Sequence, residues 1–501
     1  MMRVYYGGME KHMIQIKTTI MFVVFITFIG LNAGGTSVYA HYRHPGDVHN
    51  CEWIFSPAEF YEGTQAATSG ICSADFNGDG RLDIAIANRG PSNVMVFSND
   101  GLGQYTLLST VSIGFESVPR YVVSGDFDGD GDIDAATSNW NAHNDDPPGY
   151  GGGSLAILLN DGSGALTLTE EHIFLRTSCL DVADLNGDGI LDLIAPHWDP
   201  DVGSSGPGIA TVLKGIGDGT FVEVADVPIG NLPRGIDVGD LDNDGDIDFA
   251  VSNMGGDESI TVIENLGTFN FAVRTPLLEG STPRFLAIGD VTGDGLSDIS
   301  VVHKVPNTMI IYKNEDGFNF SLYGVYPTAD NPHSIAVADI NGDCSLDVIV
   351  SHVGDNVVYL FKNNDSGVFE RTEIESLHGP AHVITADVND SGKLDVLTAC
   401  VNGGYFNVHL SEVAQIGCTG ACFADLTHDG VVSVADLLVI ITNWGLCENF
   451  SCCGDINGDG AVNVADLLIM LDNFGGECDP EDRSLAPPQP YDSAPRPRSR
   501  R

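Results

Sequence analysis

A nine-residue pattern of alternating acidic side chains recurs seven times before residue 400 and constrains the fold of this 501-residue chain more than any other feature. Its clearest copy is Asp126-Phe-Asp128-Gly-Asp130-Gly-Asp132-Ile-Asp134, in which every odd position carries a carboxylate. Alternate side chains of a looped backbone point to one side, so oxygen atoms from positions 1, 3, 5 and 9 can surround one hard cation. Calcium is the expected ion, because it accepts about six to eight oxygen ligands in flexible geometry.

The spacing of these loops predicts a propeller. They begin at residues 75, 126, 184, 240, 290, 339 and 387, so successive starts are 51, 58, 56, 50, 49 and 48 residues apart. Each unit also carries four apolar runs, for example over residues 121–124, 133–137, 155–159 and 166–174. Four strands in a repeat of this length are typical of a propeller blade. We therefore expect a mainly β fold, with a seven-bladed propeller over residues 50–414.

The seventh unit is one strand short, since it has apolar runs only over residues 382–386, 394–399 and 406–410. The segment 53–61 precedes the first loop and has no unit of its own. We expect this segment to supply the missing outer strand of the seventh blade. Both ends of the ring would then share one blade, and no sheet edge would stay open at the seam.

The sequence Asp-Phe-Asn-Gly-Asp-Gly-Arg-Leu-Asp from Asp75 to Asp83, followed by the runs 84–87 and 93–97, resembles the FG-GAP/VCBS repeats of integrin-α-type propellers. The resemblance covers about residues 50–414 and implies that the loops bind Ca²⁺. Carried over position by position, the implied ligands are Asp75, Asn77, Asp79 and Asp83; Asp126, Asp128, Asp130 and Asp134; Asp184, Asn186, Asp188 and Asp192; Asp240, Asp242, Asp244 and Asp248; Asp290, Asp294 and Asp298; Asp339, Asn341, Asp343 and Asp347; and Asp387, Asn389 and Asp395.

The last three loops depart from the pattern. Thr292 takes the third position of the fifth loop, Cys344 replaces a turn glycine in the sixth, and Ser391 takes the fifth position of the seventh. We expect full occupancy in the first four loops, and occupancy of the last three is left open. We interpret calcium in these loops as a structural ion that stabilises the turn between two strands, and a signalling role is the alternative.

The opposite rim is the expected ligand surface. Arg120, Arg234 and Arg284 each stand six residues before a loop and directly after a proline, where they can gather around the mouth of the channel and attract an anion. Pairing with a neighbouring blade is the alternative. Two long connections, 139–154 and 196–208, add aromatic and polar groups suited to a sugar, although buried anchors would explain them equally well. The candidate rim residues are Arg120, Arg234, Arg284, Trp140, Trp198, His197 and His303.

Residues 1–40 read as an export signal, with three basic residues before an apolar run over 20–31 and a small-residue cleavage site at Val38-Tyr39-Ala40. Retention as an uncleaved anchor is the alternative. No later segment is expected to span a membrane, so the mature protein should be secreted or held at the cell surface. Lys and Arg total 22 against 70 Asp and Glu, giving a net charge of −48 and arguing against nucleic acid as a partner.

A second repeat begins after residue 416. Two loops 30 residues apart end in a carboxylate at position 12, the EF-hand spacing, and an apolar helical run follows each loop. This duplicate resembles a type I dockerin over residues 418–478, which implies a small α-helical domain and a cohesin-like partner. Six cysteines depart from the dockerin pattern, and docking on its own propeller is the alternative. The implied ligands are Asp425, Thr427, Asp429, Ser433 and Asp436, then Asp455, Asn457, Asp459, Asn463 and Asp466. Residues 479–501 read as a disordered tail.

These features favour an exported calcium-dependent binding protein, in which the propeller holds a glycan or an extracellular protein and the dockerin-like module tethers it. The alternative is a polysaccharide lyase or glycoside hydrolase, since both resemblances also occur among polysaccharide-degrading enzymes. Against an enzyme, the chain holds no Gly-x-Ser-x-Gly and no His-Glu-x-x-His motif, and calcium accounts for its paired acids. His197, His303 and His352 keep lyase-type proton abstraction open, since one of them could act as a base beside an anion-binding arginine such as Arg284. A purely structural surface protein is a third interpretation.

Overall fold

The computed structural model describes residues 53–56, 59–62, 67–114, 117–140, 153–174, 176–198, 208–256, 258–277, 281–342, 345–363 and 369–413, with 445–446, 461–462 and 467. The predicted leader, the tail, the ligand Asp343 and the ten ligands expected between residues 425 and 466 lie outside these residues. Of the predicted dockerin-like module, the structure describes a two-stranded pair, β32 (Gly445–Leu446) with β33 (Ala461–Val462). The described residues include no helix of the length and hydropathy needed to cross a membrane.

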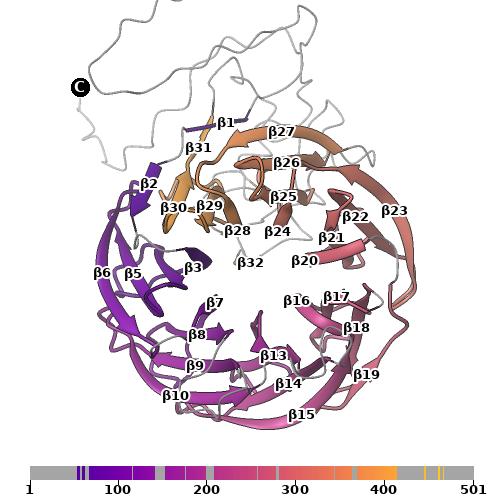
Figure 1. Cartoon of the computed structure of the whole chain (residues 1–501), viewed down its shortest axis with the longest axis horizontal. Coiled ribbons are helices and arrows are strands. Elements are labelled where there is room, and N and C mark those ends of the chain that lie inside the picture. Colours follow the sequence, from indigo (N-terminus) through magenta and orange to yellow (C-terminus); the bar gives the residue numbers. More distant parts are fainter. Residues whose placement is uncertain are drawn as a thin grey trace, which may run out of the picture. The chain divides into compact units, whose positions relative to one another are not determined.

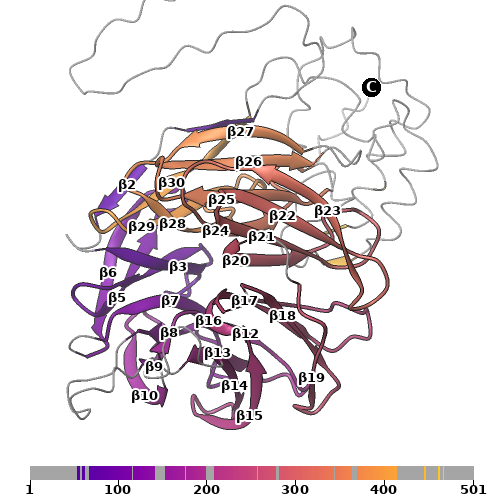
Figure 2. The same ribbon diagram turned by 45° about the vertical axis from the view of Figure 1, so that its right-hand side comes forward.

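Seven antiparallel sheets form a ring, so the predicted seven-bladed propeller is confirmed (Figure 1). In each blade the first strand lies nearest the centre and the fourth at the outer edge (Figure 2). In blade order the strands are β3 (Thr68–Ala74), β4 (Asp83–Asn88), β5 (Asn93–Asn99), β6 (Tyr105–Ser112); β7 (Pro119–Gly125), β8 (Asp134–Asn139), β9 (Gly153–Leu159), β10 (Thr167–Phe174); β11 (Arg176–Thr177) and β12 (Asp181–Ala183), β13 (Asp192–Trp198), β14 (Gly208–Gly215), β15 (Phe221–Ile229); β16 (Asn231–Gly239), β17 (Asp248–Gly255), β18 (Ile260–Asn265), β19 (Phe271–Val273); β20 (Ser281–Gly289), β21 (Asp298–Val305), β22 (Thr308–Asn314), β23 (Phe320–Pro327); β24 (Pro332–Ala338), β25 (Asp347–His352), β26 (Val357–Asn363), β27 (Phe369–Glu375); and β28 (Pro380–Ala386), β29 (Asp395–Cys400), β30 (Tyr405–His409).

The ring closes as the sequence predicts. Strand β2 (Glu59–Glu62) pairs with β30 and completes the seventh blade as its outer strand. A second short pair extends the closure, because β1 (Trp53–Phe55) runs antiparallel to β31 (Ser411–Val413). Tyr61 of β2 stacks on Phe406 with ring centroids 4.9 Å apart, and its hydroxyl donates to the carbonyl of Gly103 in the first blade. The amino-terminal strands therefore join the seventh blade to the first.

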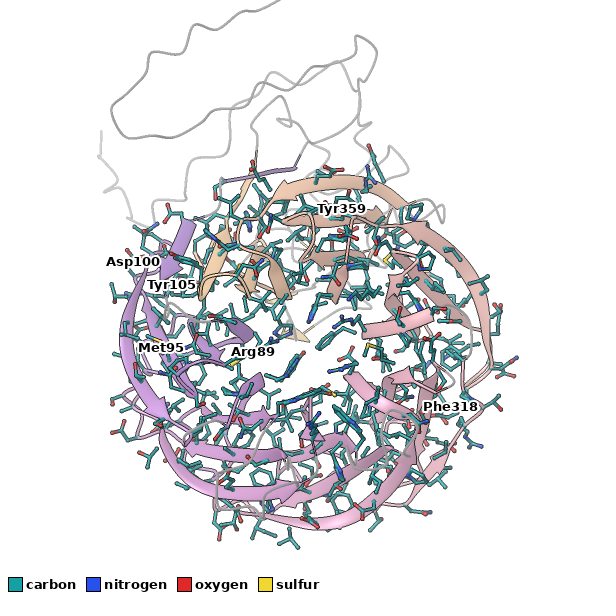
Figure 3. The ribbon with its side chains drawn as sticks, viewed as in Figure 1. Arg89, Met95, Asp100, Tyr105, Phe318 and Tyr359 are labelled. Atoms are coloured by element: carbon teal, nitrogen blue, oxygen red, sulfur yellow. The ribbon has the colours of Figure 1, made fainter. Side chains whose placement is uncertain are left out.

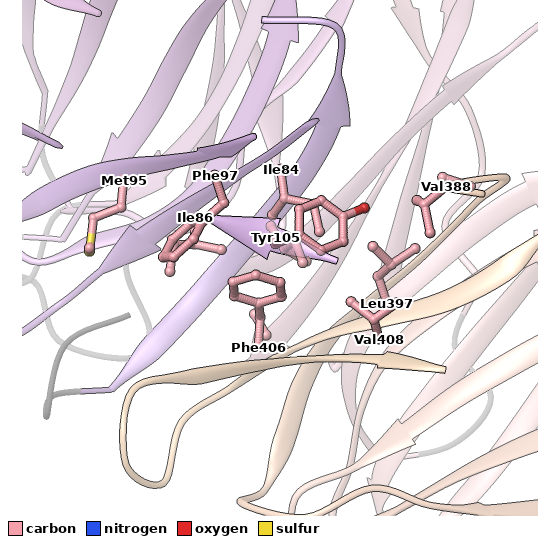
Figure 4. Close-up of a cluster of buried hydrophobic side chains, with 12 residues drawn as sticks. Ile84, Ile86, Met95, Phe97, Tyr105, Val388, Leu397, Phe406 and Val408 are labelled. Carbon is pink, nitrogen blue, oxygen red and sulfur yellow. The ribbon is translucent and has the colours of Figure 1, made fainter. Parts of the chain in front are cut away.

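The core consists of seven hydrophobic clusters, one between each pair of neighbouring blades. Both faces of a blade are buried, so its inner strands are apolar at successive positions rather than at alternate ones. In β4, Ile84 and Ile86 pack toward the seventh blade, while Ala85 and Ala87 pack toward the second. Figure 4 shows the first of these interfaces, where Ile84 and Ile86 meet Phe406 and Val408.

An asparagine at the end of the third strand joins neighbouring blades; we call this contact the asparagine latch. In the second blade the Asn160 amide nitrogen Nδ2 donates to the Phe76 carbonyl in the first blade at 2.7 Å and to the Ile133 carbonyl at 2.9 Å. Its Oδ1 accepts a hydrogen bond from the Gly164 amide. Equivalent latches come from Asn99, Asn265, Asn314 and Asn363. Gly215 and Ser411 occupy this position in the third and seventh blades, so five of the seven blades carry a latch.

Candidate functional site: acidic loops on one rim and an arginine cluster on the other

The acidic loops are shaped by hydrogen bonds from their own backbone. The first carboxylate accepts amide hydrogens from later loop residues, as Asp184 does from Gly187, Asp188 and Gly189 at 2.7–3.2 Å. Most of the turn residues are glycines with positive φ, such as Gly187 at 71°. The fourth loop instead places Asn243 at φ 59°, a conformation that asparagine tolerates better than most side chains. The alternate side chains of the loop thus face one another without any ion.

The ninth carboxylate of each loop is fully buried. In the second loop, Oδ1 of Asp134 accepts the Asn160 amide hydrogen at 2.7 Å, and Oδ2 accepts that of Phe127 at 2.8 Å. Burial raises the pKa of Asp134 to about 6 and that of Asp248 to about 7, because desolvation disfavours the charged carboxylate. A bound cation would favour the ionised form. The ninth residue therefore fastens the loop to the third strand, a role that spacing alone did not indicate.

Two loops bring three carboxylates together. One oxygen from each of Asp126, Asp128 and Asp130 lies within 4.8 Å of the others, and the same holds for Asp240, Asp242 and Asp244. Such a set of hard oxygen donors fits calcium. The second and fourth loops have a carboxylate at each of the first, third and fifth positions, whereas the first and third loops have the amides of Asn77 and Asn186 at the third position.

Basic side chains pair with the fifth carboxylate in three other loops. Lys214 lies 2.7 Å from Asp188 in the third loop, and Lys313 lies 2.9 Å from Asp294 in the fifth. In the first loop, Arg81 lies 3.3 Å from Asp79. An ammonium or guanidinium group that neutralises the fifth carboxylate competes with a metal ion for it. Calcium occupancy of the first four loops stays a prediction.

The predicted arginines do gather on the opposite rim. Arg120 stands near the start of β7, whereas the acidic loop begins six residues later, about 20 Å away along an extended strand. Arg234 and Arg284 hold the same place in the fourth and fifth blades. The structure adds Arg89, directly after β4, and Arg176 in β11; Figure 3 shows Arg89 beside the centre of the ring. We call these five residues, one from each of five consecutive blades, the arginine quintet.

Two indole rings hold part of the quintet. The Arg120 guanidinium lies 4.0 Å from the centroid of Trp140, that of Arg234 5.0 Å away and that of Arg176 5.5 Å away. Trp198 meets Trp140 edge to face at 4.9 Å and lies 5.6 Å from the Arg234 guanidinium. These distances are those of cation–π contacts. The two tryptophans therefore orient the arginines.

The guanidinium groups repel one another, and no described carboxylate pairs with them. Burial, followed by repulsion from other members of the quintet, lowers the pKa of Arg120 to about 9. Burial, and next the charge of Arg284, lowers the pKa of Arg234 to about 10. Within the described ranges no carboxylate forms an ion pair with the quintet. All five Nε atoms are buried without a hydrogen-bond partner. The alternative of pairing with an acid of the neighbouring blade is therefore wrong for the described residues.

Three of the expected rim residues are buried and cannot contact a ligand directly. His303 has no exposed surface, and its Nδ1 lies 3.2 Å from the Ser281 carbonyl oxygen. His197 is 7% exposed and bonds the Thr211 hydroxyl, while Trp198 is 3% exposed. Burial lowers the pKa of both histidines to about 4, which keeps them neutral. The prediction that these three residues lie on the ligand surface is wrong. A shared position in the repeat does not fix the face of the strand to which a side chain points.

Aromatic side chains of the first strands pack around the propeller axis. They stand at the position that follows Arg120 in the second blade and Arg284 in the fifth. Tyr121 stacks with Phe285 at 5.7 Å and lies 4.4 Å from the His382 ring. Glycines permit this packing, because a Cβ on Gly70 would lie 2.9 Å from the Tyr121 backbone, and one on Gly235 would lie 2.7 Å from that of Phe285.

Asp181 and Asp237 lie in the first strands of the third and fourth blades, three residues before the acidic loop of each blade. Asp237 accepts the Ile288 amide hydrogen at 2.6 Å. Desolvation raises its pKa to about 7 and, together with repulsion from Asp237, raises that of Asp181 well above its usual range. The pair therefore retains a proton near neutral pH. Neither residue was singled out from the sequence.

Four segments match the family model of the FG-GAP-like repeat: residues 75–137, 240–301, 290–350 and 340–398. The chain therefore contains FG-GAP-like repeats, as the acidic loops indicated, and carries them on a seven-bladed β-propeller. No curated protein sequence matches the chain.

Several solved structures are similar in fold. Crystal structures of BBS1N in complex with ARL6DN, soaked with lead or with mercury, superpose with TM-scores of 0.50 and 0.51 at 14% identity. In both, 73% of this chain and 98% of the other are covered. An Agrocybe aegerita lectin that recognises non-reducing terminal N-acetylglucosamine gives a TM-score of 0.42 at 18% identity, covering 62% of this chain and 81% of the lectin. Identities this low concern the fold alone, and the last TM-score supports no further statement.

Proposed function

We propose that this chain is a secreted or cell-surface calcium-binding protein whose propeller acts as a binding module for a glycan or an extracellular protein. The ligand contacts the rim that carries the arginine quintet. The dockerin-like segment over residues 418–478 tethers the propeller to a cohesin-like partner. The observation that supports the binding role is the quintet itself, five cationic groups that pair with no carboxylate of the described residues, in a chain with a net charge of −48.

Calcium has a structural part in this proposal. Asp126, Asp128 and Asp130 would hold one ion, and Asp240, Asp242 and Asp244 another. Each ion would neutralise a converging set of carboxylates at the turn between the first two strands of a blade. Bound calcium would thus stabilise the blades that present Arg120 and Arg234 on the other rim, and it would take no part in contacting the ligand.

A polysaccharide lyase or glycoside hydrolase is the competing function. The three histidines that could act as bases, His197, His303 and His352, are all buried, so none of them is placed to take a proton from a ligand at this rim. No other observation favours an enzyme, so binding without turnover is the proposal.

The test incubates the full mature chain with a panel of acidic and neutral polysaccharides in the presence of calcium. Retention of the protein and the formation of new reducing or unsaturated ends are measured on the same samples. We expect retention on at least one polysaccharide and no new ends. Product formation would overturn the binding proposal in favour of an enzyme, and the absence of retention on every member would refute a glycan ligand.

A further inference from the structure

The arginine quintet also indicates what the ligand must carry. Resting on the proposed binding function, we propose that these five side chains bind a compact anionic group of the ligand that presents several oxygens, either a sulfate ester or closely spaced carboxylates. Guanidinium groups suit such oxyanions, because their planar N–H donors match two oxygens at once. Each of the five arginines comes from a different blade, so one anionic group at this rim would join five consecutive blades.

The missing acidic partners are the first argument. The chain has 70 Asp and Glu against 22 Lys and Arg, so an arginine whose role is structural would readily find a carboxylate. Arg274 and Arg371 do so, pairing with Glu264 and Glu373. The quintet instead collects like charges whose buried Nε atoms have no hydrogen-bond partner. An arrangement that is unfavourable when empty and becomes favourable on binding an anion is what a recognition site requires.

The tryptophans give the second argument. A sugar-binding site of the stacking kind needs a free aromatic face, but Trp140 has three guanidinium groups within 5.5 Å of its ring centroid. Trp198 is almost completely buried behind it. Trp140 is therefore a positioning residue that holds cations in place, and the ligand meets charge rather than an indole face. This replaces the expectation that these aromatic rings stack directly on a sugar.

Net charge limits the size of the anionic group. A net charge of −48 disfavours the approach of an extended polyanion, whereas the quintet brings five positive charges together at one place. Sulfate esters and clustered carboxylates are small enough to meet several guanidiniums together without lying along acidic surface. A long nucleic acid does not satisfy this condition.

The test measures retention on short oligosaccharides coupled to one resin, in matched pairs that differ only in charge: isomaltotriose against its sulfated form, and methyl-esterified against free trigalacturonate. The calcium-loaded full chain is used throughout. We expect retention on the charged member of at least one pair, and the two pairs distinguish sulfate from carboxylate. Equal retention on a neutral member would overturn the anion proposal while leaving the binding function intact. No retention on any of the four oligosaccharides would overturn the anion proposal and, with the polysaccharide panel also negative, would refute a glycan ligand.

Variants separate recognition from packing. R120Q and R284Q should each weaken retention roughly tenfold or more, the value of one charge-assisted contact, and should raise the melting temperature of the free protein by removing like-charge repulsion. R284Q alters no tryptophan contact and serves where R120Q fails to fold. R371Q, which changes an exposed arginine that pairs with Glu373 and lies over the Tyr359 ring, should leave retention unchanged. A lower melting temperature with unchanged retention in both quintet variants would refute the proposal.

The role of Trp140 has its own readout. W140A should weaken retention, because Arg120, Arg176 and Arg234 lose the ring that orients them, whereas W140F should restore most of it. The net charge is the same in both variants. Equal loss in W140A and W140F would contradict a positioning role through the aromatic face.

Discussion

Replacing Asn160 with alanine tests whether the latches hold the blades together. The substitution leaves the Phe76 and Ile133 carbonyls and the Gly164 amide without their partner. Each buried polar group left unsatisfied costs about 1–3 kcal/mol, so the lower end of that range predicts a loss of about 3 kcal/mol of unfolding free energy. The first and second blades would separate more easily, because this side chain bonds across their boundary.

The magnitude converts to a measurable melting temperature. Unfolding entropy is about 2.1 cal/mol/K per residue, or about 0.8 kcal/mol/K over the 361 residues from Trp53 to Val413. A loss of about 3 kcal/mol therefore lowers the melting temperature by about 4 °C in scanning calorimetry. Hydrogen exchange adds a local readout, since amides along the boundary between the first two blades should exchange faster in N160A.

Ser411 supplies the matched control. It occupies the latch position of the seventh blade, and its backbone amide bonds Asp395 in the same way that the Asn160 amide bonds Asp134. In the described part of the chain its hydroxyl donates to no carbonyl of the neighbouring blade. S411A should therefore lower the melting temperature by about 1 °C or less. Equal shifts in N160A and S411A would refute the claim that the carboxamide joins the blades.

Three further predictions concern calcium, closure and pH. D128N should reduce the stoichiometry of calcium binding in isothermal titration calorimetry, and D188N should reduce it less, because the Asp188 carboxylate already pairs with Lys214. A melting temperature that chelation leaves unchanged would show that the loops bind no ion. Y61A should lower the unfolding free energy measured by urea titration by about 3 kcal/mol, because it removes the ring stacked on Phe406. Y61F removes only the hydrogen bond to the Gly103 carbonyl and should lower it by about 1 kcal/mol. Similar losses in both variants would place the effect in the hydroxyl. The folded-state pKa of Asp237 is raised to about 7, so the stability that its protonation contributes is fully present below about pH 4 and is lost as pH rises through 7. The free energy of unfolding should fall over that range, and D237N should flatten the fall. Parallel pH profiles of D237N and the unsubstituted protein would contradict the assignment.

The repeat spacing was sufficient to predict the ring and its closure, because seven copies of one unit leave few alternatives. It predicted three members of the quintet through a shared position before each loop. Arg89 and Arg176 were missed, although Arg89 stands 14 residues after Asp75, the same offset that places Trp140 after Asp126 and Trp198 after Asp184. That shared offset could have grouped the arginine with the two tryptophans.

Side-chain direction was harder to predict than position. The residues five positions after each ninth Asp share one register, yet a strand turns consecutive side chains to opposite faces, so the register does not say whether they face a ligand or the next blade. The structure buries His197 and His303 in that register. The latch asparagines were visible as a recurrent residue after the third strand, but the carbonyls they reach belong to another repeat, and local patterns do not report contacts between repeats.

Ring closure also decides how the propeller would carry a mechanical load. In an open array the last strand would be an edge strand, peeled away one hydrogen bond at a time by tension on the chain that follows. Here β30 lies between β29 and β2, with backbone ladders on both sides, and β31 is clasped by β1. A pull entering beyond Val413 must first strip the three-residue clasp and then draw out an interior strand. The strands β1 and β2, which complete the last sheet, would therefore also protect the propeller from unfolding under a force applied through the chain after Val413.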